Sequence, residues 1–386
     1  MKQETNQILF ALLRSVIRGN QLQDQEKELL TDEILSELIA ISKKHDVAHL
    51  IALCLDKNSV SFKGNKDLAG EIIKAVYRYE QINYELGELC KALEKAKIDF
   101  MPLKGSVIRK YYPEAWMRTS CDIDVLVHEA DAEKAAELFV NNYGYTRIGK
   151  GSHDVSLFSP NEIHIELHYD LVEDGLANAA STVLGCVWDT AVVRDGFAYC
   201  YEMPDEMFYF YHVAHMAKHF EEGGCGIRPF IDLWILDNIE GVDHSKRDEL
   251  LKQGNLLKFA GVSRLLSKIW LDVTEHNDIT KQMENYILRG GVYGTTENYV
   301  IIQQQKKGGR LRYALSKIFV PYDVIKFHYP VLQKHRWLTP IMEVRRWFKL
   351  IFCGHAKRTV RELKYNSNIS RAEAENAQAF LKNIGL

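Results

Sequence analysis

The hexapeptide Asp122-Ile-Asp-Val-Leu-Val127 places two carboxylates inside an otherwise apolar run. On a β-strand, residues two apart point to the same face, so Asp122 and Asp124 project together while the apolar side chains enter a core. Like charges this close repel, and one carboxyl group should take up a proton unless a cation lies between them. A hard divalent ion with oxygen ligands is the natural partner. The alternative is a pair of exposed aspartates on an edge strand.

The periodicity of apolar residues changes twice along the chain, once before and once after this hexapeptide. Apolar residues recur at helical spacing over 5–95 and again from about residue 203. Between these stretches, strand-like and helical segments alternate, which indicates an α/β or α+β unit. The expected segments are strands at 98–103, 122–127, 144–148, 153–158 and 162–168 and a helix at 130–142. We therefore predict a helical region at 1–95, a core at 96–200 and a second helical region at 201–386.

Two further segments of the core can carry chemistry. Leu103-Lys-Gly-Ser106 lies between a strand and an expected helix at 107–112, where Gly105 lets the backbone approach a ligand and the helix N-terminus favours a phosphate. Ser106 could cap that helix or bind a phosphate oxygen. In Ile163–His168, polar and apolar residues alternate strictly, so Glu166 could add a third carboxylate to the pair. An ordinary turn and a solvated strand face are the alternatives.

A histidine-rich helix is expected over 205–220. His212, His215 and His219 share one face at spacings i, i+3 and i+7. Histidines four apart can chelate zinc, but no H-E-x-x-H arrangement is present, and we favour a polar cleft wall formed by His215, Lys218 and His219. Histidines that are hydrogen-bonded in the core or solvated are the alternative. Arg228 and Asp232, four residues apart, could form an ion pair.

Charge and cysteine content limit the class of protein. The chain has 49 Lys and Arg against 52 Asp and Glu, a net charge of −3, which is unlike a general nucleic-acid binder. Its seven cysteines form no C-x-x-C, which indicates a reducing compartment and no disulfide framework. The longest N-terminal apolar run, Ile8–Leu13, is too short to span a bilayer, so we expect a soluble, cytoplasmic protein.

The C-terminal segment 326–364 is rich in Lys and Arg, with aromatic residues between them. Three structures suit this pattern: an amphipathic helix on an anionic membrane, a nucleic-acid surface, or a packed helix with a basic outer face.

The order of these segments resembles the nucleotidyltransferase superfamily of the DNA polymerase β type, with the pattern h-G-[GS], [DE]-h-[DE]-h and h-[DE]-h. The sequence is closer still to the bacterial family called uncharacterised nucleotidyltransferases, which reads L-K-G, R-x-x-x-D-I-D-x-L-V, E-x-H, H-x-x-K-H and G-x-R-x-x-x-D. The matching segments are Leu103–Gly105, Arg118–Val127, Glu166–His168, His215–His219 and Gly226–Asp232. The resemblance covers about residues 30–270, and 329–330 and 337–348 look like the family's C-terminal tail. Lys104 departs from the superfamily's first motif but fits the closer family.

The resemblance implies an α+β fold, in which a small mixed β-sheet nucleotidyltransferase core is flanked by helical regions. It implies that Asp122, Asp124 and Glu166 hold two Mg²⁺ ions, with Mn²⁺ as a possible substitute, over a bound NTP such as ATP. Glu166 would also help to deprotonate the acceptor. The residues it implies for nucleotide binding are Lys104, Gly105, Ser106, Arg118, His168, His215, Lys218, His219 and Arg228.

These implications leave three functional hypotheses. The first is transfer of an NMP group from an NTP to a small molecule, a glycan precursor or a protein, with release of pyrophosphate. The second is a catalytically silent fold that binds a nucleotide or a partner as a regulatory module, which the presence of all three acids disfavours. The third is a nucleic-acid-directed transferase, which the overall charge disfavours and the basic C-terminal segment keeps open. That segment also leaves open a peripheral contact with a membrane.

Overall fold

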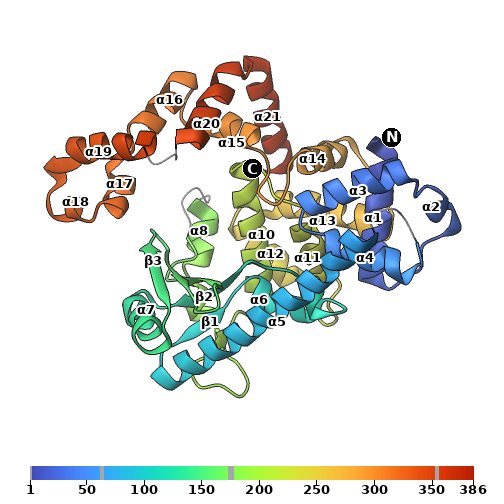
Figure 1. Cartoon of the computed structure of the whole chain (residues 1–386), viewed down its shortest axis with the longest axis horizontal. Helices are drawn as coiled ribbons and strands as arrows, with labels where there is room; N and C mark the ends of the chain where they lie inside the picture. Colours follow the sequence, from blue (N-terminus) through green and yellow to red (C-terminus); the bar gives the residue numbers. More distant parts are fainter. Residues whose placement is uncertain (1, 61–64, 173–177, 353–355) are drawn as a thin grey trace.

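The computed structural model describes residues 2–60, 65–172, 178–352 and 356–386, and most of them are helical (Figure 1). The first helices are α1 (Lys2–Arg18), α2 (Asp24–Glu28), α3 (Asp32–Lys44), α4 (Ala48–Lys57) and α5 (Asn65–Ala96). The middle of the chain forms β1 (Phe100–Pro102), α6 (Gly105–Ile108), η1 (Arg109–Tyr111), η2 (Ala115–Met117), β2 (Asp122–Val127), α7 (Glu129–Tyr143), β3 (Thr146–Lys150), β4 (Asp154–Phe158), β5 (His164–His168), α8 (Asn178–Leu184), α9 (Val187–Thr190), β6 (Val192–Val193) and β7 (Tyr201–Glu202). The remainder forms α10 (Asp205–Glu221), α11 (Arg228–Asp237), α12 (His244–Gln253), α13 (Leu257–Asp272), α14 (Asp278–Arg289), α15 (Thr296–Lys306), α16 (Arg310–Ile318), α17 (Tyr322–His328), α18 (Val331–Lys334), η3 (Arg336–Leu338), α19 (Thr339–Phe352), α20 (Ala356–Asn368) and α21 (Arg371–Ile384).

The main sheet has the strand order β1-β2-β5-β4-β3. Only the central pair, β2 and β5, is parallel, and the other neighbours are antiparallel. The connection from β2 to β5 runs through α7 and the β3–β4 hairpin. A small mixed sheet with helical flanks confirms the expected α+β class, and the strands lie within a few residues of the segments that alternation predicts.

One face of this sheet is buried against α5 and α7. Ile123 and Val125 of β2 and Ile165 and Leu167 of β5 belong to one hydrophobic cluster with Phe139 of α7. All five side chains are fully buried. Because successive strand residues point to opposite faces, this packing directs the acidic residues of β2 and β5 to the other face.

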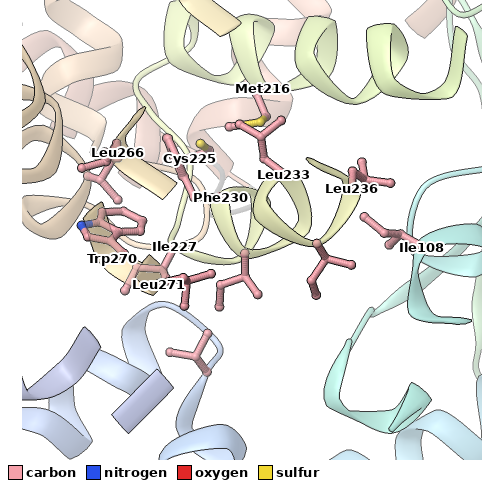
Figure 2. Close-up of a cluster of buried hydrophobic side chains, with 14 of the residues drawn as sticks. Ile108, Met216, Cys225, Ile227, Phe230, Leu233, Leu236, Leu266, Trp270 and Leu271 are labelled. Carbon is pink, nitrogen blue, oxygen red and sulfur yellow. The ribbon is translucent and has the colours of Figure 1, made fainter. Parts of the chain in front are cut away.

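A second core joins helices from both sides of the sheet region. The rings of Phe10 in α1 and Trp270 in α13 stack with their centroids 4.2 Å apart. Figure 2 shows Phe230 and Leu233 of α11 in a buried cluster with Trp270 and with Met216 of α10. The N-terminal helices and α10–α14 therefore share one core rather than forming two separate ones.

The C-terminal helices are arranged differently. We call residues 307–368, which contain α16–α20, the C-terminal arm. In it, α20 packs on α15 and α16, whereas α17–α19 extend away from the rest of the molecule (Figure 1). No helix in the described residues is both long and apolar enough to cross a membrane. The six cysteines that the structure describes are free, and Cys353 lies outside the described residues.

Candidate active site

The parallel pairing of β2 with β5 brings three carboxylates to one face of the sheet. Asp124 lies directly beside Glu166 in the register, and Asp122 lies beside His164. Two sets of possible metal ligands result, in each of which the ligand atoms lie within 4.8 Å of one another: Asp122, His164 and Glu166, and Asp124, Glu166 and His168. The three acids expected to act together are thus brought together, with Glu166 shared by both sets.

Asp124 is buried and is surrounded by positive charge. Nζ of Lys104 donates to its Oδ1 (2.8 Å), and Nε2 of His168 donates to the same oxygen (2.8 Å). Burial alone would raise the pKa of this carboxyl, but Lys104 and His168 together hold the pKa of Asp124 far below its ordinary value. The carboxylate of Asp124 is therefore ionised at neutral pH, as a ligand of a cation must be.

The other two acids have different surroundings. Burial and the neighbouring charge of Asp124 raise the pKa of Asp122. The contact with His168 (3.3 Å) lowers the pKa of Glu166. Burial opposes the charged form of His168, yet its contacts with Asp124 and Glu166 raise the pKa of this imidazole. The pKa of Asp122 is raised by burial and by the nearby acids Asp124 and Glu166, and carboxylate oxygens are the donors that Mg²⁺ and Mn²⁺ prefer, so the residues fit a divalent cation.

Lys104 is held by the turn between β1 and α6. Its backbone has φ +46° and ψ −122°, a region that side-chain-bearing residues rarely adopt. The N–H of Leu103 donates to the carbonyl of Asp124 (3.0 Å), which ties this turn to β2. Gly105 lines the pocket, and a Cβ there would lie 3.4 Å from Cβ of Ser120 and 3.6 Å from Nη1 of Arg118.

The helix after this turn differs from the expected one. It begins at Gly105 and lasts one turn before becoming a 3-10 helix, whereas the expected helix covers 107–112. Lys104, not Ser106, occupies the N-cap position, so the expectation that Ser106 caps the helix is wrong. The N–H of Ser106 already donates to the carbonyl of Leu103 (3.1 Å). The strained turn, rather than a long helix, presents Lys104 and Gly105 to the pocket.

Helix α10 forms the opposite wall. His215, Lys218 and His219 line the pocket, as the helical spacing predicts. Nε2 of His219 lies 3.0 Å from Nε2 of His215. Burial and the charge of Lys104 lower the pKa of His215 to about 3, so its ring is neutral. His212 donates to the carbonyl of Pro229 (2.9 Å), and neither set of metal ligands among the described residues includes an α10 histidine.

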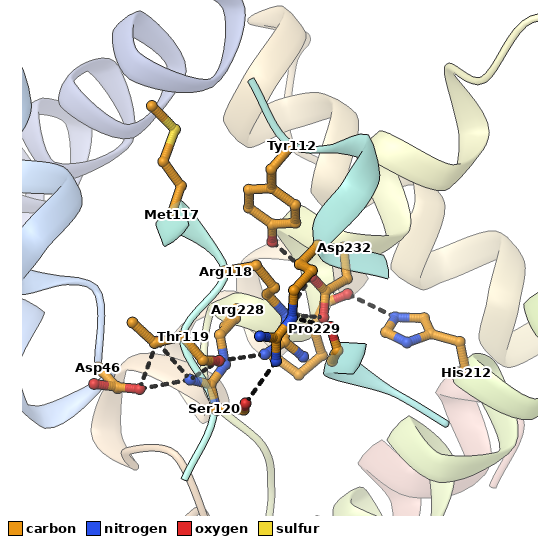
Figure 3. Close-up of polar contacts among 12 residues, drawn as sticks. Asp46, Tyr112, Met117, Arg118, Thr119, Ser120, His212, Arg228, Pro229 and Asp232 are labelled. Carbon is orange, nitrogen blue, oxygen red and sulfur yellow. Dashed lines mark hydrogen bonds and ion pairs between the residues drawn. The ribbon is translucent and has the colours of Figure 1, made fainter. Parts of the chain in front are cut away.

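Two arginines support the rim of the pocket through separate ion pairs (Figure 3). Nε of Arg118 donates to both oxygens of buried Asp232 (2.8 and 2.9 Å), which also accepts from Tyr112 (2.5 Å). Arg228 instead contacts Asp46 (2.5 Å). The suggested pair between Arg228 and Asp232 is therefore wrong, because Asp232 binds Arg118.

The second arginine also fixes the loop before β2. Nη1 of Arg228 donates to the carbonyl and to Oγ1 of Thr119 (both 3.0 Å), and Thr119 donates to Asp46 (2.9 Å). Both arginines line the pocket while these partners hold them. The rim thus joins the α3–α4 turn, the segment before β2 and the start of α11.

Some pocket residues carry no sequence motif. Tyr211 of α10 is buried in the pocket wall, its hydroxyl has no hydrogen-bond partner among the described residues, and burial raises its pKa. His45 and Tyr293 line the pocket from the α3–α4 turn and the segment after α14. Tyr211 precedes His215 by one helical turn, and this spacing could have identified it, whereas no local signal marks His45 or Tyr293.

The complete pocket has a volume of about 390 Å³. Ligand pockets in proteins commonly span about 300–1,000 Å³, so this cavity can hold a small molecule. Carboxylates line one side of it, and Lys104, Arg118, Lys218 and Arg228 contribute positive charge. This distribution suits an anionic ligand held together with a cation.

Comparison with known proteins identifies the family. The sequence profile of the uncharacterised nucleotidyltransferase family matches residues 32–272, which include the sheet, the acidic cluster and α10. A search of curated proteins found no match. A search of solved structures found none either. The matched region covers more than half of the sequence, and the chain therefore belongs to the uncharacterised nucleotidyltransferase family.

Proposed function

We propose that the protein transfers a nucleoside monophosphate group from an NTP to a hydroxyl- or phosphate-bearing acceptor. The observation that carries this proposal is the pairing of Asp124 with Glu166 across two parallel strands, with Asp122 on the same face. In the reaction, an acceptor oxygen forms a bond to the α-phosphorus, and the bond to the β-phosphate oxygen breaks. Pyrophosphate leaves, and the acceptor gives up its proton.

The protein's own residues have distinct roles in this proposal. Asp122, Asp124 and Glu166 hold the Mg²⁺ ions, for which Mn²⁺ can substitute. Bound divalent ions stabilise charge on the attacking and leaving oxygens of an in-line displacement. Glu166 accepts the proton of the acceptor hydroxyl, and Lys104 or Arg118 offsets the charge of the phosphates. Positioning and charge suffice for such a transfer, so no covalent intermediate with the protein is required.

The remaining nucleotide-binding assignments belong to the same proposal. Gly105 lets the backbone approach the β- and γ-phosphates, and the hydroxyl of Ser106 binds a phosphate oxygen. Two sets of side chains contact the nucleotide or the acceptor from the rim and from the facing wall. They are Arg118 and Arg228 at the rim, and His168, His215, Lys218 and His219 in the pocket wall. The acceptor is a small molecule, a glycan precursor or a protein, and the reaction takes place in the cytoplasm.

One observation favours a second candidate function. The ammonium group of Lys104 already neutralises Asp124 within the protein, so the carboxylate has a cationic partner without any metal. A fold of this kind could bind a nucleotide or a protein partner without transferring anything. Release of pyrophosphate distinguishes the two functions.

The proposal is tested first by measuring nucleotide binding and then by measuring turnover. Thermal unfolding is measured with each of the four NTPs, with and without Mg²⁺ or Mn²⁺, for the wild type, for D122N/D124N and for D189N. Asp189 is exposed on α9 and serves as the matched control. At a hundred times its dissociation constant, a ligand stabilises the folded state by about 2.7 kcal/mol. We expect a metal-dependent shift with one NTP in the wild type and in D189N but not in D122N/D124N.

Turnover is then measured with the NTP that binds. Pyrophosphate release with a panel of sugars, sugar phosphates and proteins supports the transferase and identifies its acceptor class. Tight, metal-independent binding with no pyrophosphate release under any condition supports the silent module instead. Equal shifts in the wild type and in D122N/D124N contradict the role given to the acids.

A further inference from the structure

The C-terminal arm carries a concentration of positive charge that the whole-chain average conceals. Residues 307–368 contain 14 Lys and Arg against 3 Asp and Glu, a net charge of +11. The rest of the chain therefore carries −14. Such a separation of charge within one protein is typical of a segment that meets a polyanionic surface.

Two of the three acids of the arm are buried in it and do little to cancel this charge on its surface. Glu343 is buried and accepts from Nε of Arg346 (2.8 Å) and from the N–H of Val320 (2.6 Å). Glu362 is also buried and lies 2.7 Å from Nζ of Lys317. Both glutamates thus hold the helices of the arm together and leave its surface to the cations.

Helix α19 also turns an apolar stripe outward. Trp337 in η3 is 73% exposed, and Ile341, Val344 and Phe348 of α19 are 55%, 45% and 59% exposed. Ile341, Val344 and Phe348, at spacings i, i+3 and i+7, lie on one side of α19, and Trp337 lies in η3 directly before this helix. A helix that packs in a protein core directs such a stripe inward. Here the inward side is occupied by other groups: the indole N–H of Trp347 donates to the carbonyl of Ile318 (2.7 Å), and the Trp347 ring packs edge-on against Phe319 with the centroids 5.5 Å apart.

Cations border this stripe. Arg345 and Lys349 are exposed on the same helix, one residue after Val344 and Phe348. A second helix repeats the arrangement, because Leu311, Leu315 and Ile318 of α16 are exposed at spacings i, i+4 and i+7 near exposed Arg312. Large apolar side chains flanked by Lys and Arg are the signature of helices that lie in the plane of a membrane interface.

We propose that the C-terminal arm docks the protein on the surface of an anionic lipid bilayer. The apolar stripe of α19 enters the boundary between headgroups and acyl chains, and Arg345 and Lys349 contact the headgroups. A nucleic acid would also satisfy the charge, but it offers nothing to Ile341 and Val344, because nucleic-acid surfaces stack aromatic groups and bind phosphates rather than aliphatic side chains. The projection of α17–α19 away from the body leaves this surface accessible (Figure 1).

Vesicle binding of the full chain tests this inference without any nucleotide, so its outcome is independent of the proposed catalysis. Co-sedimentation is measured with vesicles of phosphatidylcholine alone and with mixed phosphatidylglycerol–phosphatidylcholine vesicles. We expect binding to the mixed vesicles that weakens as salt is added, and little binding to phosphatidylcholine alone. Because exposed Trp337 enters the interface, tryptophan emission should shift to shorter wavelength on binding, and this shift should be lost in W337F.

Two variants separate the apolar from the electrostatic contribution. I341A/V344A removes aliphatic carbons without changing charge, and we expect partition into mixed vesicles to fall by at least about tenfold. R345A/K349A leaves the stripe and removes two cations, and we expect a fall of about 30-fold on mixed vesicles only. I73A, at an aliphatic side chain that is 70% exposed on α5, is the matched control and should bind like the wild type. Circular dichroism verifies that each variant is folded.

Any of the following results would contradict the proposal. If the protein does not bind mixed vesicles, the arm does not dock on anionic membranes. Equal binding to both vesicle types removes the role of the cations, and unchanged binding of I341A/V344A removes the role of the stripe. Tighter binding to duplex DNA or RNA than to mixed vesicles at the same salt concentration assigns the arm to nucleic acid instead.

Discussion

Asp122 and Asp124 are two residues apart on one strand, yet their surroundings shift their pKa values in opposite directions. Lys104 and His168 contact the carboxylate of Asp124, whereas that of Asp122 lies beside other acids. One carboxylate is therefore stabilised within the fold, and the other, which is buried beside a like charge, costs stability. Natural sites often retain such unfavourable groups because function needs them.

Substituting each aspartate should change stability in opposite directions. Without divalent ions at neutral pH, D122N should raise the free energy of unfolding by about 1 kcal/mol, because it removes repulsion. D124N should lower it by about 3 kcal/mol, because it leaves the ammonium of Lys104 without its ion-pair partner. Urea denaturation measures both values. Destabilisation of similar size by both variants would show that the two carboxylates are equivalent.

Asp232 should give the protein a pH-dependent stability. Burial opposes its charge, but Arg118, His212 and Tyr112 hold the pKa of Asp232 below its ordinary value of 3.8. A depressed pKa in the folded state means that the stabilisation is present above pH 3.8 and is lost as the pH falls through the folded value. D232N should therefore cost about 3 kcal/mol at neutral pH and progressively less in acid.

Urea midpoints of D232N and the wild type across this pH range measure the difference. D189N, at an exposed carboxyl, should follow the wild type at every pH. A cost for D232N that stays constant with pH would mean that the carboxylate charge does not contribute.

Several residues of the site were predictable from local spacing. Alternation along β2 and β5 identifies the three acids, and the helical period of α10 identifies its polar wall. The partners of these residues were not predictable in the same way. The pair between Arg118 and Asp232 joins segments 114 residues apart, and the pattern of either segment contains no information about the other. For the same reason the sequence suggested that Arg228 pairs with its neighbour on the same helix.

At the scale of elements, the turn between β1 and α6 stores backbone strain at a charged residue. Lys104 has φ +46°, and strain of this kind costs about 1–3 kcal/mol. K104G and K104M both remove the ammonium group, but only K104G relieves the strain. K104G should therefore be more stable than K104M by about 1–3 kcal/mol in urea denaturation, while both bind NTP less tightly. Equal stability of the two variants would argue against strain in this turn.

A contact between two loops shapes the wall of the pocket near Tyr293. A Cβ on Gly294 would lie 2.0 Å from the carbonyl oxygen of Gly223, and Gly294 has φ +67°. G294A should destabilise the protein by about 3 kcal/mol or more and weaken nucleotide binding, because the loops must separate. Gly19 has a similar φ of +74° with open space around it, so G19A should cost only about 1 kcal/mol. Thermal unfolding compares the two, and equal costs would mean that backbone conformation alone sets the effect.

The elements themselves were largely predictable, and their ends less so. Strict alternation predicts the strands, and apolar residues at helical spacing predict α10 and the helical character of the chain after residue 203. The helix expected at 107–112 begins two residues earlier and tightens into a 3-10 helix. That change follows from the backbone of Lys104, because a positive φ before the helix fixes where it can start. No propensity of the local sequence predicts a lysine in that conformation.

At the scale of the whole molecule, the extended arm should enlarge the protein in solution. A compact chain of 386 residues has a radius of gyration of about 21 Å. Small-angle X-ray scattering should give a larger value, because α17–α19 lie outside the body (Figure 1). A value of about 21 Å or less would mean that the arm folds back onto the negatively charged body.

The overall organisation was predictable in outline. Changes of hydrophobic period predict the order helical region, sheet region, helical region. They do not show that α1 packs on α13, because packing between distant helices depends on shape rather than on period. The strand order was not predictable either. β5 pairs with β2, and the hairpin of β3 and β4 lies on the other side of β5 from β2, which no local pattern indicates.

The position of the acids within the sheet determines what happens to them when the protein is stressed. β2 and β5 each have a neighbouring strand on both sides, so their backbone groups are among the last to open. Amides over 122–126 and 164–168 should exchange with deuterium only when the whole domain unfolds, whereas those of the edge strand β3 exchange sooner. Tags, labels or cleavage sites placed on β3 or on the C-terminal arm should thus leave the acidic cluster in place.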